Sequence, residues 1–157
     1  MRKPIKLLIV LFASTLLFAA CVNPSVTNID TDEAKTLIQN VKELDPSIEK
    51  VKIIYSRQSY APEFISIDVF CRNQPAQKIV DLILDHTKQF ITVENVNRMK
   101  LPSSVDVDVF LRIHTDNEKD EPFVQYSTTY YKSNDHTDDS PENIDGFQTW
   151  VKGEQPD

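Results

Sequence analysis

Cys71, His86 and His114 are the side chains of this chain best suited to nucleophilic chemistry. A thiol and an imidazole that meet in space can serve as a nucleophile and its general base. A reactive thiol must be exposed and close to positive charge, because the thiolate is the nucleophile. Cys71 instead alternates in phase with Ile65 and Ile67, on the strand side that we expect to face the core. The sequence therefore favours a buried structural thiol, and a small hydrolase or thiol enzyme that uses Cys71 with His86 or His114 is the alternative.

Motifs for other common chemistries are absent from the sequence. Glycine occurs only at Gly146 and Gly153, whereas phosphate-binding loops, dinucleotide fingerprints and nucleophile elbows need glycine at tight turns. The three histidines are scattered, and neither an HExxH nor a CxxC motif occurs. The acidic stretch 135–139 lacks the ligand spacing and turn glycine of a calcium loop. We expect no metal, no cofactor and a protein that binds rather than catalyses, with a carrier of a ligand or ion as a further alternative.

A five-residue pattern, D-V-F-x-R, occurs at residues 68–72 and again at residues 108–112. If each copy is a β-strand, Asp, Phe and Arg lie on one face and the aliphatic residues and Cys71 on the other. A half-buried strand needs such alternation, so the pattern can arise twice without duplication. Aromatic residues and arginine are also enriched at the centres of protein interfaces. The candidate partner-binding residues are Phe64, Phe70, Arg72, Phe110, Arg112 and, from the C-terminal segment, Trp150.

Three arrangements of these aromatic residues are open at the level of sequence. They can form a patch that docks a partner, or a C-terminal segment carrying Trp150 can fold back and cover them. Alternatively, the twist and order of the strands can disperse them. Only the first arrangement is functional.

The first 21 residues, MRKPIKLLIVLFASTLLFAAC, have the features of an export signal. A cationic start precedes an apolar run at residues 7–17 and the small pair Ala19 and Ala20, directly before Cys21. Even with the small pair, this run is shorter than the roughly 20 residues that span a bilayer as a helix. The segment is therefore expected to direct export rather than to form a permanent transmembrane helix.

The junction LFAAC resembles the lipobox of bacterial lipoproteins. The resemblance implies attachment of a diacylglyceryl group to the thiol of Cys21, cleavage after Ala20, and acylation of the new amino terminus, with palmitate as a typical chain. Two or three acyl chains anchor a protein stably, because each buried methylene contributes about 0.8 kcal/mol. We therefore expect an extracytoplasmic protein that is anchored to the cell membrane through lipid on Cys21, and an envelope protein is its candidate partner.

Charge and cysteine content narrow the class of protein further. Removal of residues 1–20 takes away three basic residues and no acidic one, which changes the formal net charge from −7 to about −10. Such a charge repels nucleic acid, so we expect no nucleic-acid partner. With Cys21 lipidated, Cys71 has no partner within the chain for a disulfide, and side-chain packing must hold the fold.

Hydrophobic periodicity predicts two helices and four strands. Apolar residues three and four positions apart mark helices over residues 30–44 and 75–90. Alternating apolar residues mark two pairs of strands, at 51–56 with 64–72 and at 105–115 with 122–132. The order αββαββ predicts an α+β fold in which two helices pack on one face of a four-stranded, mainly antiparallel sheet.

The predicted organisation has four parts: a signal peptide at 1–20, a lipidated tether at 21–29, a single α+β domain at 30–132, and a C-terminal tail at 133–157. The tail begins with acidic, turn-rich residues that offer nothing to bury, so we expect this part to be mobile and to bind no structural metal. Residues 144–151, in contrast, are too apolar for a segment that is merely solvated.

Overall fold

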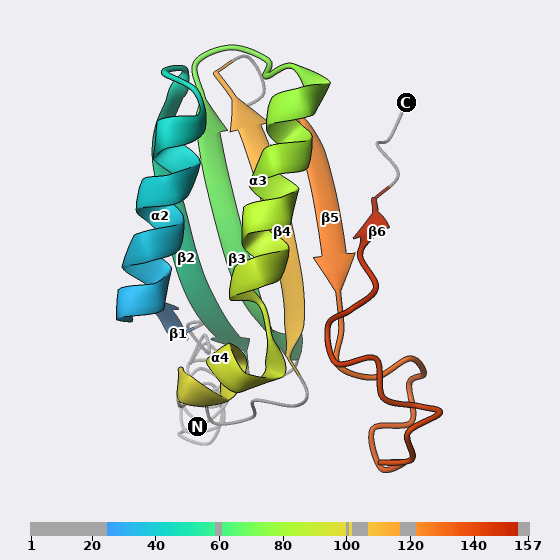
Figure 1. The fold of residues 1–157 in the computed structure, drawn as a ribbon. Coiled ribbons are helices and arrows are strands. Elements are labelled where there is room, and N and C mark those ends of the chain that lie inside the picture. The colour runs from blue at the N-terminus through green and yellow to red at the C-terminus, as the bar shows by residue number, and fades with distance from the viewer. Residues whose placement is uncertain (1–24, 59–60, 100, 102–106, 117–121, 154–157) are drawn as a thin grey trace, which may run out of the picture.

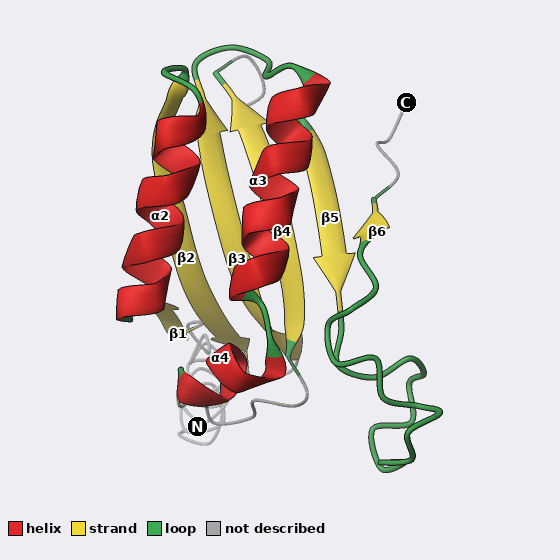
Figure 2. Ribbon diagram, in the orientation of Figure 1, coloured by secondary structure: helices red, strands yellow, loops and turns green. Residues whose placement is uncertain are grey.

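A computed structural model of the 157-residue chain describes residues 25–58, 61–99, 101, 107–116 and 122–153. The predicted signal peptide and Cys21 lie outside these residues. The described residues form a six-stranded sheet with helices along one of its faces (Figure 1). Figure 2, coloured by element type, shows the helices as one layer in front of the strands. None of the helices in the described ranges is long and apolar enough to span a membrane.

The strands lie in the sheet in the order in which they follow one another along the chain. They are β1 (Ser25–Asn28), β2 (Ile48–Gln58), β3 (Ala61–Cys71), β4 (Asp108–Thr115), β5 (Val124–Thr128) and β6 (Val151–Lys152). β3 and β4 are parallel, and the other neighbouring strands are antiparallel. The sheet is therefore a set of antiparallel strands with one parallel pair at its centre.

The parallel pair requires a long connection, because parallel strands cannot be joined by a tight turn. Helices α3 (Gln77–Phe90) and α4 (Val93–Arg98) supply this crossover, and α2 (Asp32–Leu44) joins β1 to β2. In Figure 1, α2 and α3 run side by side along the same face of the sheet, and α4 lies at its lower end. The two long helices thus leave the opposite face of the sheet uncovered by any helix among the described residues.

The α+β class predicted from the sequence is confirmed, but the described residues contain three helices and six strands rather than two and four. β1 comes from the predicted tether 21–29, and β6 comes from the predicted tail. β1 is exposed along its whole length, and β6 has only two residues, so neither shows the alternation on which strand prediction depends. Helix α4 comes from the connector before β4 and is too short for a periodic pattern.

The helix-covered face of the sheet holds the hydrophobic core. Thr31 caps the start of α2 by accepting a hydrogen bond from the Ala34 backbone N–H, and Pro46 follows its end. The buried helix residues include Ala34, Leu37, Val41, Val80, Ile83 and Phe90. They pack against the sheet residues Ile53, Ile65, Ile67, Val69, Val109, Leu111 and Ile113. Each fully buried aliphatic side chain stabilises the fold by about 1.5–3 kcal/mol. Packing of these side chains is therefore the main stabilising interaction among the described residues, in which Cys71 is a free thiol.

The acidic segment after β5 forms a hydrogen-bonded loop around Asn143. The Asn143 side chain is buried, and its Nδ2 donates to the backbone carbonyls of Asp135 and Asp138 at 2.8 and 3.0 Å. Its Oδ1 accepts from the Ser133 backbone N–H, and Tyr131 pairs with Ile144 in an isolated bridge. The expectation that this stretch has nothing to bury is therefore wrong at Asn143.

The apolar segment that follows closes against the edge of the core. Phe147 is 2% exposed and contacts Tyr130, with ring centroids 5.8 Å apart. Gly146 and Phe147 both have positive φ values, 64° and 65°, a conformation that costs a side-chain-bearing residue such as Phe147 free energy. Burial of the Phe147 ring offsets this cost. The chain then reaches β6, which pairs with β5.

Asn143→Ala should loosen this loop without unfolding the sheet. The substitution leaves two backbone carbonyls and one backbone N–H without their side-chain partner, which should cost about 1–2 kcal/mol of unfolding free energy. Amide hydrogen exchange should quicken at residues 132–147 and stay slow in β3 and β4. Glu142→Ala, an exposed neighbouring change, is the matched control. Exchange in the wild-type loop as fast as in an unfolded peptide would contradict the hydrogen-bonded loop.

Candidate functional site

One face of the sheet is covered by α2 and α3, and we call the opposite side, formed by β2, β3 and β4, the open face. Strand register places alternate residues there, because neighbouring side chains point to opposite sides of a sheet. The open face consists of Lys50, Lys52, Ile54, Ser56, Phe64, Ser66, Asp68, Phe70, Asp108, Phe110, Arg112 and His114. The four candidate residues Phe64, Phe70, Phe110 and Arg112 therefore share one face, opposite Cys71 and Leu111.

The parallel register of β3 and β4 brings the two D-V-F-x-R copies together with an offset. Asp68, the first residue of the first copy, lies opposite Arg112, the last residue of the second. Arg112 Nε and Nη2 donate to the two carboxylate oxygens of Asp68 at 2.6 and 3.1 Å. Asp68 is buried, and the Arg112 side chain is 31% exposed. The repeated pattern thus supplies the two halves of one bidentate ion pair.

Two further polar side chains complete the surroundings of Asp68. Ser66 Oγ donates a hydrogen bond to Asp68 Oδ1 at 2.9 Å, and His114 Nε2 lies 3.5 Å from the same oxygen. Burial by itself raises the pKa of Asp68, but hydrogen bonding to His114, Arg112 and Ser66 and the charge of Arg112 outweigh it and lower the pKa to about 2. Asp68 is therefore ionised at neutral pH.

Aromatic rings lie on both sides of this polar cluster. Phe70 stacks on His114 with ring centroids 4.8 Å apart and planes 13° apart, and Lys52 Nζ lies 5.4 Å from the centroid of the Phe70 ring. Toward the start of β3, Phe64 and Phe110 meet edge to face at 5.8 Å. The aromatic residues are half-buried, so they hold one another in place while part of each ring stays accessible.

The structure does not bring the other two candidate residues into this cluster. Arg72 lies just beyond the end of β3, and its guanidinium pairs with Glu49 at 2.7 Å. Trp150 packs against the hydrophobic core cluster rather than against the three phenylalanines of the open face. The C-terminal segment therefore closes the edge of the sheet and does not cover the open face through Trp150.

Sequence reasoning missed the central member of the cluster, Asp68, as a site residue. Alternation placed Asp68 and Arg112 on the same side of their strands, which is the only signal that the sequence offers. Alternation along single strands could not show that β3 and β4 are neighbours or that Asp68 lies opposite Arg112. This pairing is determined by the crossover through α3 and α4.

The geometry separates the components of the alternative thiol site. Cys71 is 1% exposed on the helix-covered face, whereas His114 lies on the open face. Burial, followed by the charge of Asp45, raises the pKa of the Cys71 thiol to about 11, so the thiol stays protonated at neutral pH. His86 lines a groove of about 330 Å³ together with residues of α2, α3 and Asn95 of α4.

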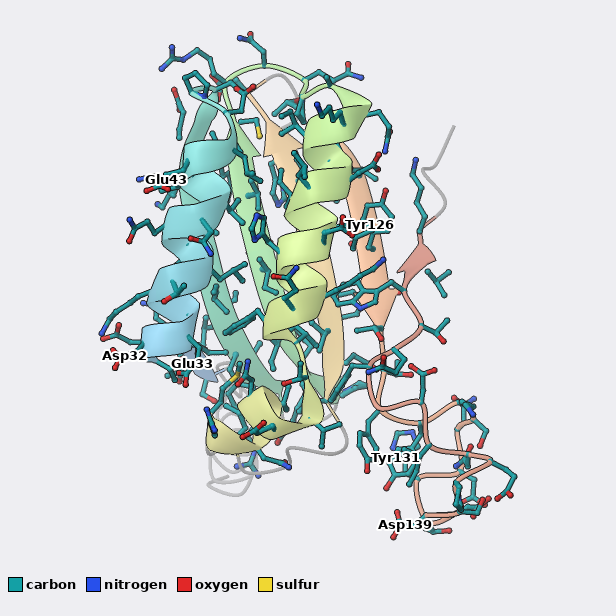
Figure 3. The ribbon with its side chains drawn as sticks, in the orientation of Figure 1. Asp32, Glu33, Glu43, Tyr126, Tyr131 and Asp139 are labelled. Atoms are coloured by element: carbon teal, nitrogen blue, oxygen red, sulfur yellow. The ribbon has the colours of Figure 1, made fainter. Side chains whose placement is uncertain are left out.

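A second groove, of about 380 Å³, lies where the acidic loop meets the lower end of the sheet. Its lining includes Asp108, Tyr130, Tyr131, Lys132 and His136. Burial raises the pKa of Asp108, and the charge of His136 opposes this. Figure 3 shows Tyr131 and Asp139 at this end of the molecule, where the Tyr131 hydroxyl donates to the Asp139 carboxylate.

No group of three or more metal-ligating side chains is placed to hold a metal ion in the parts of the chain that the structure describes. The carboxylates of the acidic loop accept hydrogen bonds from its own residues. Asp135 accepts from the Thr137 backbone and hydroxyl, and Asp138 accepts from the Ser140 backbone. These bonds shape the loop.

The fold and the open face together define an α+β domain with one helix-covered and one open sheet surface. No family model matches the sequence, and no curated protein matches it. A crystal structure described as "Sex pheromone staph-cAM373 precursor" is similar at a TM-score of 0.44 and 8% sequence identity, over 84% of this chain and 41% of that one. This chain therefore spans less than half the length of that protein.

Asp68→Asn should remove part of the acid dependence of stability. The folded-state pKa of Asp68 is lowered, so its contribution is present above its ordinary pKa of 3.8 and is lost as the pH falls toward about 2. At pH 7 the substitution should lower the free energy of unfolding by about 2–3 kcal/mol, because Arg112 loses its charged partner. Urea unfolding at pH 7 and between pH 2 and 4 measures both effects. Asp108→Asn, on the same face, is the control, and an equal effect of the two changes would contradict the assigned ion pair.

Cys71 should behave as a structural residue in thiol titration. The native protein should react slowly with an aromatic disulfide reagent and quickly in denaturant, because the thiol is buried and protonated. Lys50→Cys, at an exposed position, provides a fast-reacting control. Cys71→Ala should cost about 1–3 kcal/mol of unfolding free energy through lost packing. Rapid labelling of Cys71 in the native protein would contradict this assignment.

Proposed function

We propose that this protein is a non-catalytic, lipid-anchored binding or accessory protein of the bacterial cell envelope, which holds a partner protein on its open face. Lipidation at Cys21 keeps the domain on the outer side of the cell membrane. This part of the proposal rests on the resemblance of the LFAAC junction to a lipobox. The binding part rests on the composition and organisation of the open face.

The arrangement of half-buried aromatic rings around a fixed ion pair is the observation that carries the binding proposal. Phe64, Phe70 and Phe110 are held by contacts with one another or with His114, so little side-chain entropy is lost when a partner covers them. Among the described residues, His114 Nδ1 is buried without a hydrogen-bond partner, which costs about 1–3 kcal/mol when the group stays unsatisfied. His114 is thus held by ring stacking and by Asp68 rather than by a bond at this nitrogen.

The charges on this face favour an acidic partner. Lys50 and Lys52 are exposed and form no ion pair within the described residues. They lie beside Phe70 on a chain whose formal net charge is −7. Complementary charge raises association rates and excludes partners of the wrong sign. We therefore expect an envelope protein that presents carboxylates next to apolar side chains.

A ligand carrier is the second candidate, because the groove between the acidic loop and the sheet has about 380 Å³ and aromatic walls. A thiol enzyme has less support. Its nucleophile would be a buried, protonated thiol on the helix-covered face, whereas His114, on the adjacent strand β4, lies on the other face of the sheet.

The proposed function predicts that partner capture depends on the charge of the open face. Lys50→Glu with Lys52→Glu should abolish crosslinking of one specific envelope protein in intact cells and leave the melting temperature nearly unchanged, since both side chains are exposed. Lys78→Glu with Lys88→Glu changes the net charge equally on α3 and should leave crosslinking unaffected.

Two outcomes would separate the parts of this proposal. A mature wild-type protein that is soluble and carries no lipid mass would refute the anchor, and Cys21→Ala is the control that should release the domain. Equal crosslinking by both charge-reversed variants would refute the open face as the binding surface.

A further inference from the structure

The strand nearest the proposed lipid anchor is built into the edge of the sheet. Ser25, the first residue of β1, lies opposite Arg57 of β2, and Asn28 lies opposite Ile54. The backbone N–H of Ile29 then bonds to the Ile53 carbonyl, and Ile29 is buried. The predicted tether 21–29 is therefore part of the folded domain from Ser25 onward.

Only residues 22–24 separate Cys21 from this strand. An extended chain spans at most about 3.3–3.6 Å per residue, so the Cα atoms of Cys21 and Ser25 are at most about 14 Å apart. A lipidated Cys21 lies at the membrane surface, which leaves Ser25 little freedom to move away from it. The direction of β1 then decides which end of the domain faces the membrane.

We propose that the end of the sheet marked by Ser25 and Arg57 faces the lipid bilayer, so that the Lys50, Phe70 and His114 half of the open face points away from it. This inference rests on the proposed lipidation of Cys21. The membrane-facing end is the lower end of Figure 1, where β1 pairs with the end of β2 and where the start of β3 and helix α4 also lie.

Strand geometry sets the height of the open face above the membrane. Val26 lies opposite Ser56, and Lys50 precedes Ser56 by six positions along β2. At about 3.3 Å per residue, Lys50 lies roughly 20 Å farther along the sheet than Val26. The basic and aromatic end of the open face is thus out of contact with lipid headgroups and accessible to a protein partner.

Ion pairs neutralise part of the positive charge at the membrane-facing end, which weakens its attraction to an anionic bilayer. Three of the basic side chains described near this end are paired with acidic ones: Lys35 with Asp30, Arg57 with Glu63, and Arg98 with Glu33 and Glu94. The acidic loop reaches this end at the opposite edge of the sheet (Figure 1). Repulsion of the loop by anionic lipid tilts the domain so that the β1 edge lies nearest the surface.

Fluorescence quenching in vesicles tests this orientation. Val26→Cys and Lys50→Cys place a dye on two exposed positions of the same sheet surface, near and far from the anchor, while Cys71 stays buried in both variants. The lipidated full-length protein is reconstituted into phosphatidylethanolamine and phosphatidylglycerol vesicles that carry a headgroup quencher. Quenching should be several-fold stronger for the dye at position 26 than at position 50.

A longer tether is the matched control. Insertion of 12 Gly-Ser residues after Cys21 adds up to about 40 Å of reach and should remove most of the difference while vesicle binding persists. Equal quenching at both positions in vesicle-bound protein without the insert would overturn the orientation and leave the anchor standing. A protein that carries no lipid and does not bind vesicles would overturn both.

Discussion

The structure depends on the parallel pairing of β3 with β4. This pairing joins the two antiparallel halves of the sheet, and its register sets Asp68 opposite Arg112. A buried ion pair contributes little net stability, because desolvation of the two charges cancels much of their attraction. Its larger effect is on specificity. A one-residue slip of β4 would send Val109 and Leu111 to the open face and separate Arg112 from Asp68, so hydrophobic burial and the ion pair select the same register.

The same pairing explains which parts of the fold the sequence could predict. Alternation in β3 and β4 and helical periodicity in α2 and α3 each describe one element and its buried face, and these predictions agree with the burial of Ile67, Leu111 and Ile83. The neighbour of each strand is a long-range property that local pattern does not contain. The D-V-F-x-R repeat shows the difference. The alternation of side chains along a strand predicts that Asp, Phe and Arg share one face of the sheet. It does not predict that Asp68 pairs with Arg112, because this contact depends on the crossover that places β3 next to β4.

The C-terminal segment shows a second reason why sequence reasoning stops short. Composition placed residues 133–143 among mobile tails, because none of them is apolar. Asn143 stabilises the loop through hydrogen bonds instead, because its side chain bonds to the backbone carbonyls of Asp135 and Asp138. A hydrophobic pattern in the sequence does not indicate such bonds. The positive φ of Phe147 is equally invisible in sequence, since this conformation is favoured by glycine and is set here by burial of the ring.

The open face keeps three phenylalanines partly accessible without forming a continuous apolar surface. Serine and charged residues alternate with the rings along each strand, so the apolar area is divided rather than continuous. The outermost strands β1 and β6 are short, which limits the unpaired backbone that these two strands offer to another chain. In the proposed lipid-anchored state, a short tether adds a further restraint, because it would fix the end of the domain nearest the membrane and turn the basic part of the open face outward. In that orientation, the proposed acidic partner would approach from the side away from the bilayer, where neither lipid nor the acidic loop would compete for Lys50 and Lys52.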